Sequence, residues 1–172
     1  MFFDNTIHSF KDARRIARRR LPWMVFDYID GAAGTEHAEQ FNRDMLRDIW
    51  LQPRILRNVQ HRSIAMPLFG KQARLPFGIA PMGMCNLSSP SADTLLASLA
   101  AQHQIPVGVS TVASTSLEKM IDLSQGNAWF QLYLSGAMEG SNRLMARART
   151  SGYDTLVLTV DVPEVGRRPR EL

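Results

Sequence analysis

Four short apolar segments alternate with longer amphipathic ones in the second half of the chain. The segments FGIAP, VGVST, FQLYL and LVLTV start near residues 77, 107, 130 and 156. Their starts are therefore 30, 23 and 26 residues apart (107−77, 130−107, 156−130). Between them, ADTLLASLAAQHQ, STSLEKMIDLS and MEGSNRLMARARTSG have the helical spacing of apolar positions. This pattern predicts a parallel α/β sheet whose strands are apolar on both faces because helices cover them.

Two parallel architectures fit this alternation. A doubly wound sheet usually has a glycine-rich phosphate turn after its first strand, but the turn here, IAPMGMCNLSSPS, has no GxGxxG motif. A TIM barrel places polar residues at the carboxyl ends of several strands, and all four strands expected here end in that way. A complete barrel usually has ~250 residues and eight strands. We therefore predict an α/β fold, the N-terminal half of a TIM (β/α)8 barrel with about four parallel βα units, preceded by an N-terminal helical segment.

The first part of the chain lacks this alternation of strands and helices. Residues up to about 50 have helical patterns, in which Asp12 helps to start the first helix, Pro22 takes the first position of the next and Thr35 caps a third. From DIWLQPRIL to SIAMPLFGKQARLP the pattern is short and extended, and it is interrupted by Pro53, Pro67 and Pro76. Because proline is confined to edge positions of a sheet, this stretch predicts a small hairpin or irregular lead-in rather than a central sheet. We divide the chain into a helical and lead-in segment, 1–76, and a first half-barrel, 77–172.

Composition is that of an ordinary globular protein. Hydrophobic residues make up 45% of the 172 and charged residues 21%. No apolar run approaches the ~20 residues of a membrane-spanning helix, and the start MFFDNTIHSFKD lacks the pattern of a secretory signal. The single cysteine, Cys85, cannot form an internal disulfide. We expect a reducing, cytoplasmic location.

Much of the net charge of +4 lies in the segment DARRIARRRLP, which contains Arg14, Arg15 and Arg18–Arg20. Such a cluster can bind an anionic partner such as nucleic acid or a lipid surface. It can also be the solvated face of an amphipathic helix, because apolar residues recur at helical spacing opposite most of the arginines, at Phe10, Ala13, Ala17 and Leu21. We favour the solvated face, and no nucleic-acid partner is expected.

Polar side chains gather at the ends of the expected strands. Gln131 and Tyr133 are two residues apart and so face the same side of their strand, as do Thr159 and Asp161 in theirs. Ser110 ends another strand, where it caps a helix about as readily as it binds a ligand. Buried polar groups are costly unless something pairs with them. The residues together indicate a polar-ligand site at one end of a barrel, although an internally satisfied polar layer is the alternative.

Asp161 has a more specific expected role. An unperturbed carboxylate titrates near ~4, too low for efficient proton abstraction at neutral pH. Asp161 is better suited to orient and stabilise an imidazolium. The four histidines, His8, His37, His61 and His103, lie away from the expected strand ends, so we expect the histidine partner outside this chain. No metal site is predicted.

Taken together, these stretches resemble the FMN-dependent α-hydroxy-acid dehydrogenase/oxidase family, which includes glycolate oxidase, L-lactate dehydrogenase and mandelate dehydrogenase. The matching motifs are LPWMVFDYIDGAAGTE, LQPRIL, LPFGIAPMGM, VSTVASTSLE, WFQLYL and LTVDVPEVGRR. They occur in family order over most of residues 10 to 168. The resemblance implies a TIM barrel and FMN as cofactor. It places the backbone of Pro81, Met82 and Gly83 against the flavin ring, and the side chains of Ser110, Gln131 and Thr159 at its polar edge.

The resemblance also implies roles around the substrate. Tyr28 and Tyr133 contact the carboxylate or hydroxyl of the substrate, Asp161 pairs with the catalytic histidine and Arg168 lies near the substrate mouth. Met82 departs from the small hydroxyl residue or valine common in the family. Val112 stands where some oxidases carry an aromatic residue, which leaves substrate shape open. The family's flavin-contacting lysine, histidine–arginine motif and phosphate loops are expected beyond residue 172.

We therefore expect a fragment of an FMN-dependent oxidoreductase that oxidises L-2-hydroxy acids, lactate-like ones foremost, to 2-oxo acids. It lacks the catalytic histidine and arginine and is expected to be inactive alone. Two alternatives stay open: a non-catalytic product of a truncated reading frame, and an anion- or nucleic-acid-binding module. Expected partners are the small 2-hydroxy acid, the missing C-terminal half of the barrel and further copies of the chain. The complete enzyme is expected in the cytoplasm or at the membrane periphery.

Overall fold

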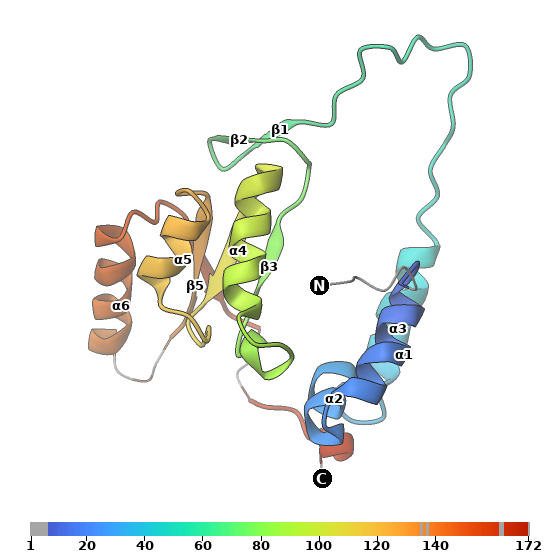
Figure 1. Cartoon of the computed structure of the whole chain (residues 1–172). Helices are drawn as coiled ribbons and strands as arrows, with labels where there is room; N and C mark the ends of the chain where they lie inside the picture. The colour runs from blue at the N-terminus through green and yellow to red at the C-terminus, as the bar shows by residue number, and fades with distance from the viewer. Residues whose placement is uncertain (1–6, 135, 137, 162–163, 172) are drawn as a thin grey trace. The chain divides into compact units, whose positions relative to one another are not determined.

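The computed structural model describes residues 7–134, 136, 138–161 and 164–171. These residues form two compact units (Figure 1): a helical unit made by the residues up to Arg57 together with Glu164–Glu171, and a sheet unit made by Asn58–Asp161. The units divide the chain differently from the segments 1–76 and 77–172, because residues 58–76 group with the sheet and 164–171 return to the helices. The division into segments stays a prediction.

The helical unit contains three α-helices and a short C-terminal turn of 3-10 helix. These elements are α1 (Phe10–Arg20), α2 (Trp23–Asp30), α3 (His37–Arg47) and η2 (Pro169–Glu171). None of the helices in the described parts of the chain combines the length and apolar content needed to cross a membrane. The helices α1, α2 and α3 are the three that the sequence predicts in the first 50 residues.

Two of these helix starts differ in detail from those expected. Asp12 helps to start α1, as expected, together with the N-cap Ser9: the Ser9 hydroxyl accepts the N–H of Asp12 at 3.2 Å and donates to the Asp12 carboxylate at 2.9 Å. Pro22 is the N-cap of α2 rather than its first residue. Thr35 was wrong as the cap of α3, because Glu36 occupies that position in a left-handed conformation (φ 63°). The starts of α2 and α3 therefore lie one residue after those expected.

A small antiparallel hairpin precedes the main sheet, as expected. β1 (Met66–Leu68) pairs with β2 (Lys71–Ala73), with Pro67 opposite Gln72. Phe69 and Gly70 connect the strands with positive φ angles of 45° and 82°. Two positive φ angles in a two-residue loop match the right-handed twist of the flanking strands. The hairpin therefore forms as a tight local unit.

The main sheet has four parallel strands in chain order, β3-β4-β5-β6. The strands are β3 (Ile79–Met82), β4 (Val107–Ser110), β5 (Ala128–Tyr133) and β6 (Leu156–Thr159). Between them come η1 (Cys85–Leu87), α4 (Ala92–His103), α5 (Leu117–Leu123) and α6 (Met138–Thr150). Figure 1 shows α4, α5 and α6 alongside the sheet. The α/β class with about four parallel strands and intervening helices is confirmed.

The core lies between the sheet and these helices. It is formed by strand residues Val107, Val109, Phe130 and Leu132 with helix residues Ala97, Ala100, Met120 and Ala148. Small alanines let α4 and α6 approach the β-branched and aromatic strand residues closely. Burial on both faces, expected for all four strands, is wrong for β3, whose Ala80 and Met82 are exposed, and for β6, where Leu156 and Leu158 are 48% and 45% exposed. They are register partners of the buried Phe130 and Leu132, but no described helix covers them.

Candidate functional site

Four of the expected site residues project from one face of the sheet. Ser110 is the register partner of Gln131, and Tyr133 is the partner of Thr159. Gln131 and Tyr133 are two apart on β5 and so share a side. Phe130 and Leu132 on β5 point the other way, into the helix-covered core. The four polar side chains therefore form a row across the carboxyl ends of β4, β5 and β6.

Gln131 is the centre of this polar row. Its side chain is 3% exposed. Its amide Nε2 donates to the hydroxyl oxygen of Thr159 at 2.7 Å, and its Oε1 accepts the backbone N–H of Thr111 at 3.2 Å. A buried amide with both ends bonded has one fixed orientation. The structure thus brings Gln131 and Thr159 together, as expected.

Thr111 completes the polar row although the sequence analysis gave it no site role. Its hydroxyl donates to the backbone oxygen of Gln131 at 2.7 Å and accepts the N–H of Tyr133 at 3.3 Å. Ser110 accepts the N–H of Val112 at 3.2 Å, which holds the turn after β4. A second hydroxyl residue directly after Ser110 was the available signal. These bonds lock the ends of β4 and β5 together.

The turn after β3 lies against the end of β4 because glycines make room for it. A Cβ on Gly108 would come within 2.6 Å of the ring nitrogen of Pro81, and a Cβ on Gly83 within 2.5 Å of the Val112 side chain. The N–H of Met84 donates to the oxygen of Val112 at 3.0 Å. Met82 is exposed. The segment Pro81–Gly83 therefore sits beside Ser110 with backbone groups near the surface.

The buried carboxylate of Asp93 connects the turn after β3 with the turn after β4. Asp93, in the first turn of α4, is 2% exposed, and its carboxylate accepts the N–H of Thr115 at 2.9 Å. The side-chain oxygen of Asn86 accepts the N–H of Asp93 at 3.4 Å, and the N–H of Asn86 donates to Ser114 at 3.4 Å. An acid inside the apolar run ADTLLASLAA is the sequence signal that points to this buried role. Asp93 thereby fixes the spacing of the turns after β3 and β4.

Cys85 is a neighbour of this carboxylate. Burial, together with a hydrogen bond and the negative charge of Asp93, raises the pKa of the Cys85 thiol to about 11. The thiol is therefore protonated at neutral pH and is a poor nucleophile. This agrees with a packing role for Cys85.

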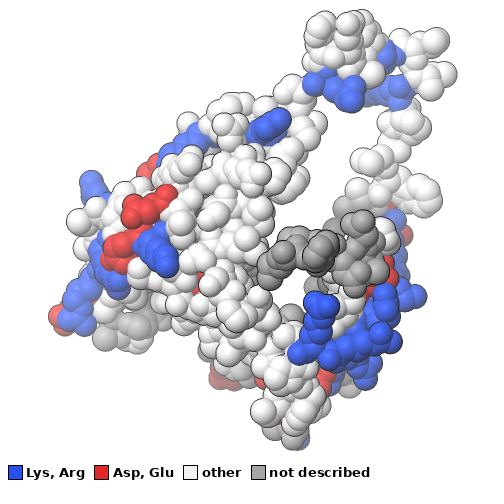
Figure 2. Space-filling view, in the orientation of Figure 1, with Lys and Arg blue, Asp and Glu red and all other residues white. Residues whose placement is uncertain are grey.

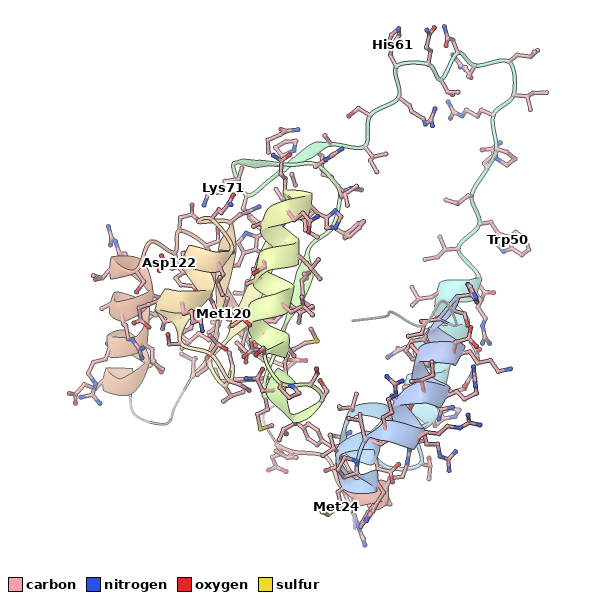
Figure 3. The ribbon with its side chains drawn as sticks, viewed as in Figure 1. Met24, Trp50, His61, Lys71, Met120 and Asp122 are labelled. Carbon is pink, nitrogen blue, oxygen red and sulfur yellow. The ribbon has the colours of Figure 1, made fainter. Side chains whose placement is uncertain are left out.

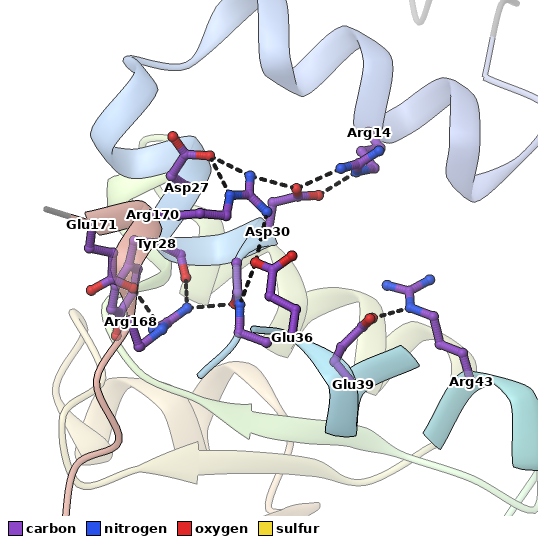
Figure 4. A network of polar contacts seen from close by, with 12 residues as sticks. Arg14, Asp27, Tyr28, Asp30, Glu36, Glu39, Arg43, Arg168, Arg170 and Glu171 are labelled. Carbon is purple, nitrogen blue, oxygen red and sulfur yellow. Dashed lines mark hydrogen bonds and ion pairs between the residues drawn. The ribbon is translucent and has the colours of Figure 1, made fainter. Parts of the chain in front are cut away.

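Tyr28 and Arg168, both expected near the substrate, meet within the helical unit (Figure 4). The guanidinium of Arg168 lies 5.2 Å from the centre of the Tyr28 ring. It donates to the backbone oxygens of Tyr28 at 2.7 Å and of Gly31 at 2.6 Å, and pairs with Glu171 at 2.8 Å. A cation at the C-terminal carbonyls of a helix is favourable. Arg168 thus caps α2 at the turn that carries Tyr28.

A second arginine fastens the same turn. Arg170 forms ion pairs with Asp27, with Asp30 at 2.9 Å and with Glu36 at 3.2 Å. Arg14 binds the Asp30 carboxylate from the other side, at 2.8 Å. Hydrogen bonds from Arg14 first and from Arg170 next lower the pKa of Asp30 to about 2. Figure 4 shows this network closing over the end of α2.

Asp161 follows β6 and is exposed. Among the described residues it forms no hydrogen bond or ion pair. The orienting role assigned to it therefore has an accessible carboxylate but no partner within the described chain, and it stays a prediction. Tyr28 and Arg168 belong to the helical unit and the polar row to the sheet unit.

The donor set of the polar row fits the polar edge of the expected flavin. Gln131 keeps a second amide hydrogen and a second oxygen lone pair after the bonds described above. The oxygens of Ser110 and Thr159 act as acceptors in their bonds, so that their hydroxyl hydrogens can donate to a ligand. A ring edge with alternating N–H and C=O groups needs such mixed partners. The residues present therefore suit FMN.

Comparison with known proteins points the same way. A family model described as FMN-dependent dehydrogenase matches residues 17–172. The chain is 38% identical to an L-lactate dehydrogenase of Pseudomonas syringae pv. syringae over 165 residues, which are 96% of this chain and 43% of that enzyme. It is 35% identical to an (S)-mandelate dehydrogenase of Pseudomonas putida, with 96% and 42% covered.

Solved structures give a similar result. A crystal structure of mandelate oxidase superimposes with a TM-score of 0.88 at 35% identity, over 94% of this chain and 47% of that one. The described fold is therefore that of part of a TIM barrel with its preceding helices. The chain spans less than half the length of the relatives it matches.

Proposed function

Because the chain belongs to the FMN-dependent dehydrogenase family, we propose that it forms the flavin-holding part of an enzyme that oxidises L-2-hydroxy acids to 2-oxo acids. The observation that carries this proposal is the row formed by Ser110, Gln131 and Thr159. In this row the Gln131 amide donates to the Thr159 hydroxyl at 2.7 Å and accepts the backbone N–H of Thr111 at 3.2 Å. The relatives named as lactate and mandelate dehydrogenases support this substrate class. A lactate-like acid is the proposed substrate.

The polar row would hold the flavin by its edge and leave the ring exposed for reaction. Gln131 is preorganised by Thr111 and Thr159 and so binds without loss of side-chain freedom. The backbone of Pro81, Met82 and Gly83 would lie against the ring. FMN, when bound, supplies the redox chemistry, since its ring accepts the hydride equivalent removed from the substrate carbon.

Substrate recognition is assigned to Tyr28, Tyr133 and Arg168. The half-exposed Tyr133 is beside Thr159 in register. Arg168, whose guanidinium is bonded to the backbone of Tyr28 and Gly31 and to Glu171, would act by holding the turn that carries Tyr28. Asp161 would orient and stabilise the histidine that takes the hydroxyl proton. We propose that this histidine comes from the remaining part of the barrel, so that these 172 residues alone do not turn over substrate.

The same proposal extends to assembly and location. The remaining half of the barrel is the partner that would cover Leu156 and Leu158 on β6. We propose that the complete protein is a homo-oligomer in the cytoplasm. If its electron acceptor lies in the membrane, the complete protein binds at the membrane periphery. Neither assignment affects the chemistry of the polar row.

A chimera tests the proposed function. This chain replaces the matching part of the Pseudomonas syringae L-lactate dehydrogenase, and the purified product is assayed for flavin absorbance and lactate-dependent dye reduction. We expect bound FMN and turnover, and we expect Gln131→Leu to reduce flavin content at least tenfold while Gln102→Leu, on the exposed side of α4, leaves it unchanged. A chimera that melts cooperatively yet contains no flavin would contradict the proposal.

A further inference from the structure

The basic helix α1 is a surface that the flavin site does not use. Within its 11 residues it carries six cations, Lys11, Arg14, Arg15, Arg18, Arg19 and Arg20, and one acid, Asp12. Arg14 is bound to Asp30, and Arg15 pairs weakly with Asp12 at 3.4 Å. Lys11, Arg18, Arg19 and Arg20 make no ion pair with described residues. Figure 2 shows Lys and Arg side chains gathered over the helical unit.

Most of these cations share one face of the helix. Lys11, Arg15 and Arg18 recur at i, i+4 and i+7, and Arg14 and Arg19 flank them. Together with Asp12 they line an open hollow of about 350 Å³. We name Lys11, Arg14, Arg15, Arg18 and Arg19 the basic face. The opposite side, with Ala13 and Ala17, is partly buried.

Such a face is unfavourable in isolation. Lys11–Arg15, Arg14–Arg18 and Arg15–Arg19 are like-charge pairs at i, i+4, which destabilise a helix. Asp30 and Asp12 relieve Arg14 and Arg15. For Lys11, Arg18 and Arg19, an external anion would remove the repulsion. The solvated face favoured from the sequence accounts for the exposure of these cations but leaves this like-charge repulsion in place.

Exposed apolar side chains follow the basic face directly. Trp23 and Met24 begin α2 and are each 61% exposed, although the next apolar helix residues include the buried Phe26. Figure 3 shows Met24 at the lower end of the helical unit in this view. Trp23 is four positions after Arg19, so their Cα atoms lie within about 14 Å of each other. Tryptophan and arginine side chains both suit the headgroup layer of a bilayer.

We propose that the basic face, with Trp23 and Met24, binds the surface of a membrane containing anionic phospholipids. Phosphate headgroups would neutralise Lys11, Arg18 and Arg19, and Trp23 and Met24 would enter the boundary between headgroups and acyl chains. An exposed methionine gains nothing from the hydrated backbone of a nucleic acid, which is why a lipid partner is favoured. The proposal concerns the helical unit and does not depend on the flavin site.

Vesicle sedimentation of the 172-residue chain tests this surface. We expect the chain to pellet with vesicles in which about a third of the lipid is phosphatidylglycerol, to remain in solution with phosphatidylcholine alone, and to be released by salt. The triple variant Lys11→Gln/Arg18→Gln/Arg19→Gln should weaken the binding by roughly a hundredfold, since each cation near an anionic bilayer contributes about fivefold. Trp23→Ala should abolish any blue shift of tryptophan fluorescence that vesicles cause.

The control removes the same charge elsewhere. Arg54, Arg57 and Arg62 are exposed and form no ion pair with described residues, so the variant Arg54→Gln/Arg57→Gln/Arg62→Gln should keep vesicle binding. Equal loss in both triple variants, equal binding to neutral vesicles, or no pelleting with anionic vesicles would overturn the proposal. So would binding to single-stranded RNA, lost in the first triple variant, without binding to vesicles. Far-UV circular dichroism confirms that each variant keeps its helices.

Discussion

Gln131 donates a hydrogen bond of 2.7 Å to the hydroxyl of Thr159 across two neighbouring parallel strands, although 28 residues separate them in the chain. The bond joins the ends of β5 and β6 at the rim where the proposed flavin binds. It also orients the Gln131 amide, because Thr111 holds the other end of that group. Stability and site geometry therefore depend on the same atoms.

Thr159→Val tests this bond. Valine keeps the shape but removes the acceptor, which leaves a buried amide hydrogen unpaired and should lower the free energy of unfolding of the sheet unit by about 1–2 kcal/mol. Thr159→Ser keeps the oxygen and should cost less. Urea unfolding, followed by the fluorescence of Trp129 on β5, measures both. Equal losses would mean that the methyl group, not the hydrogen bond, matters.

Asp93→Ala should be more damaging than a surface substitution. It removes the buried acceptor for the partly buried N–H of Thr115, and we expect a loss of about 2–3 kcal/mol in the free energy of unfolding. Amide hydrogen exchange at Thr115 should accelerate. Asp122→Ala, on the exposed side of α5, is the matched control and should change neither quantity.

The Cys85 thiol should react slowly in the folded protein. Because its pKa is raised to about 11, little thiolate is present at mildly alkaline pH. Alkylation by iodoacetamide, followed by mass spectrometry, should be much slower in buffer than in urea. Asp93→Asn removes the nearby negative charge and should speed alkylation of the folded chain. Equal rates in buffer and urea would show that the thiol is not protected.

Acid should loosen the helical unit through Asp30. Its pKa is lowered from 3.8 to about 2 in the folded chain, first by Arg14 and then by Arg170. A carboxyl with a depressed folded pKa contributes stability that is fully present above its unfolded pKa. That stability is lost as pH falls from 3.8 towards about 2. The melting temperature of the wild type should drop across this interval.

A pair of variants isolates this contribution. Asp30→Asn should lower the melting temperature at neutral pH and flatten its decline in acid. Asp48→Asn removes an exposed carboxylate that forms no ion pair with described residues, and it should keep the wild-type profile. An unchanged acid profile in Asp30→Asn would refute the assignment to this group.

The periodic part of the fold was visible in the sequence. The apolar runs VGVST and FQLYL predicted β4 and β5, and the helical spacing of apolar residues in ADTLLASLAAQHQ predicted α4, because burial of an element is visible in the order of its own residues. The shared face of Gln131 and Tyr133 also followed from their spacing. Local periodicity therefore sufficed for the strands and for the polar row.

Contacts between distant segments left no such trace. Arg170 and Asp27 are 143 residues apart, and nothing near either residue indicates the other. The burial of Asp93 depends on a turn 22 residues away. The exposure of Leu156 depends on what lies beside β6 rather than on β6 itself. Each of these features depends on contacts between residues that are distant in the chain, and the local pattern around one residue does not reveal its distant partner.

The strand order β3-β4-β5-β6 is also the order of synthesis. Each strand leaving the ribosome therefore finds the edge that it must extend already emerged, and no later segment has to be inserted between earlier ones. Growth by addition to one end keeps each nascent intermediate a smaller version of the finished sheet. Ribosome-bound chains stalled after α5 should accordingly already protect the amides of β4 from exchange.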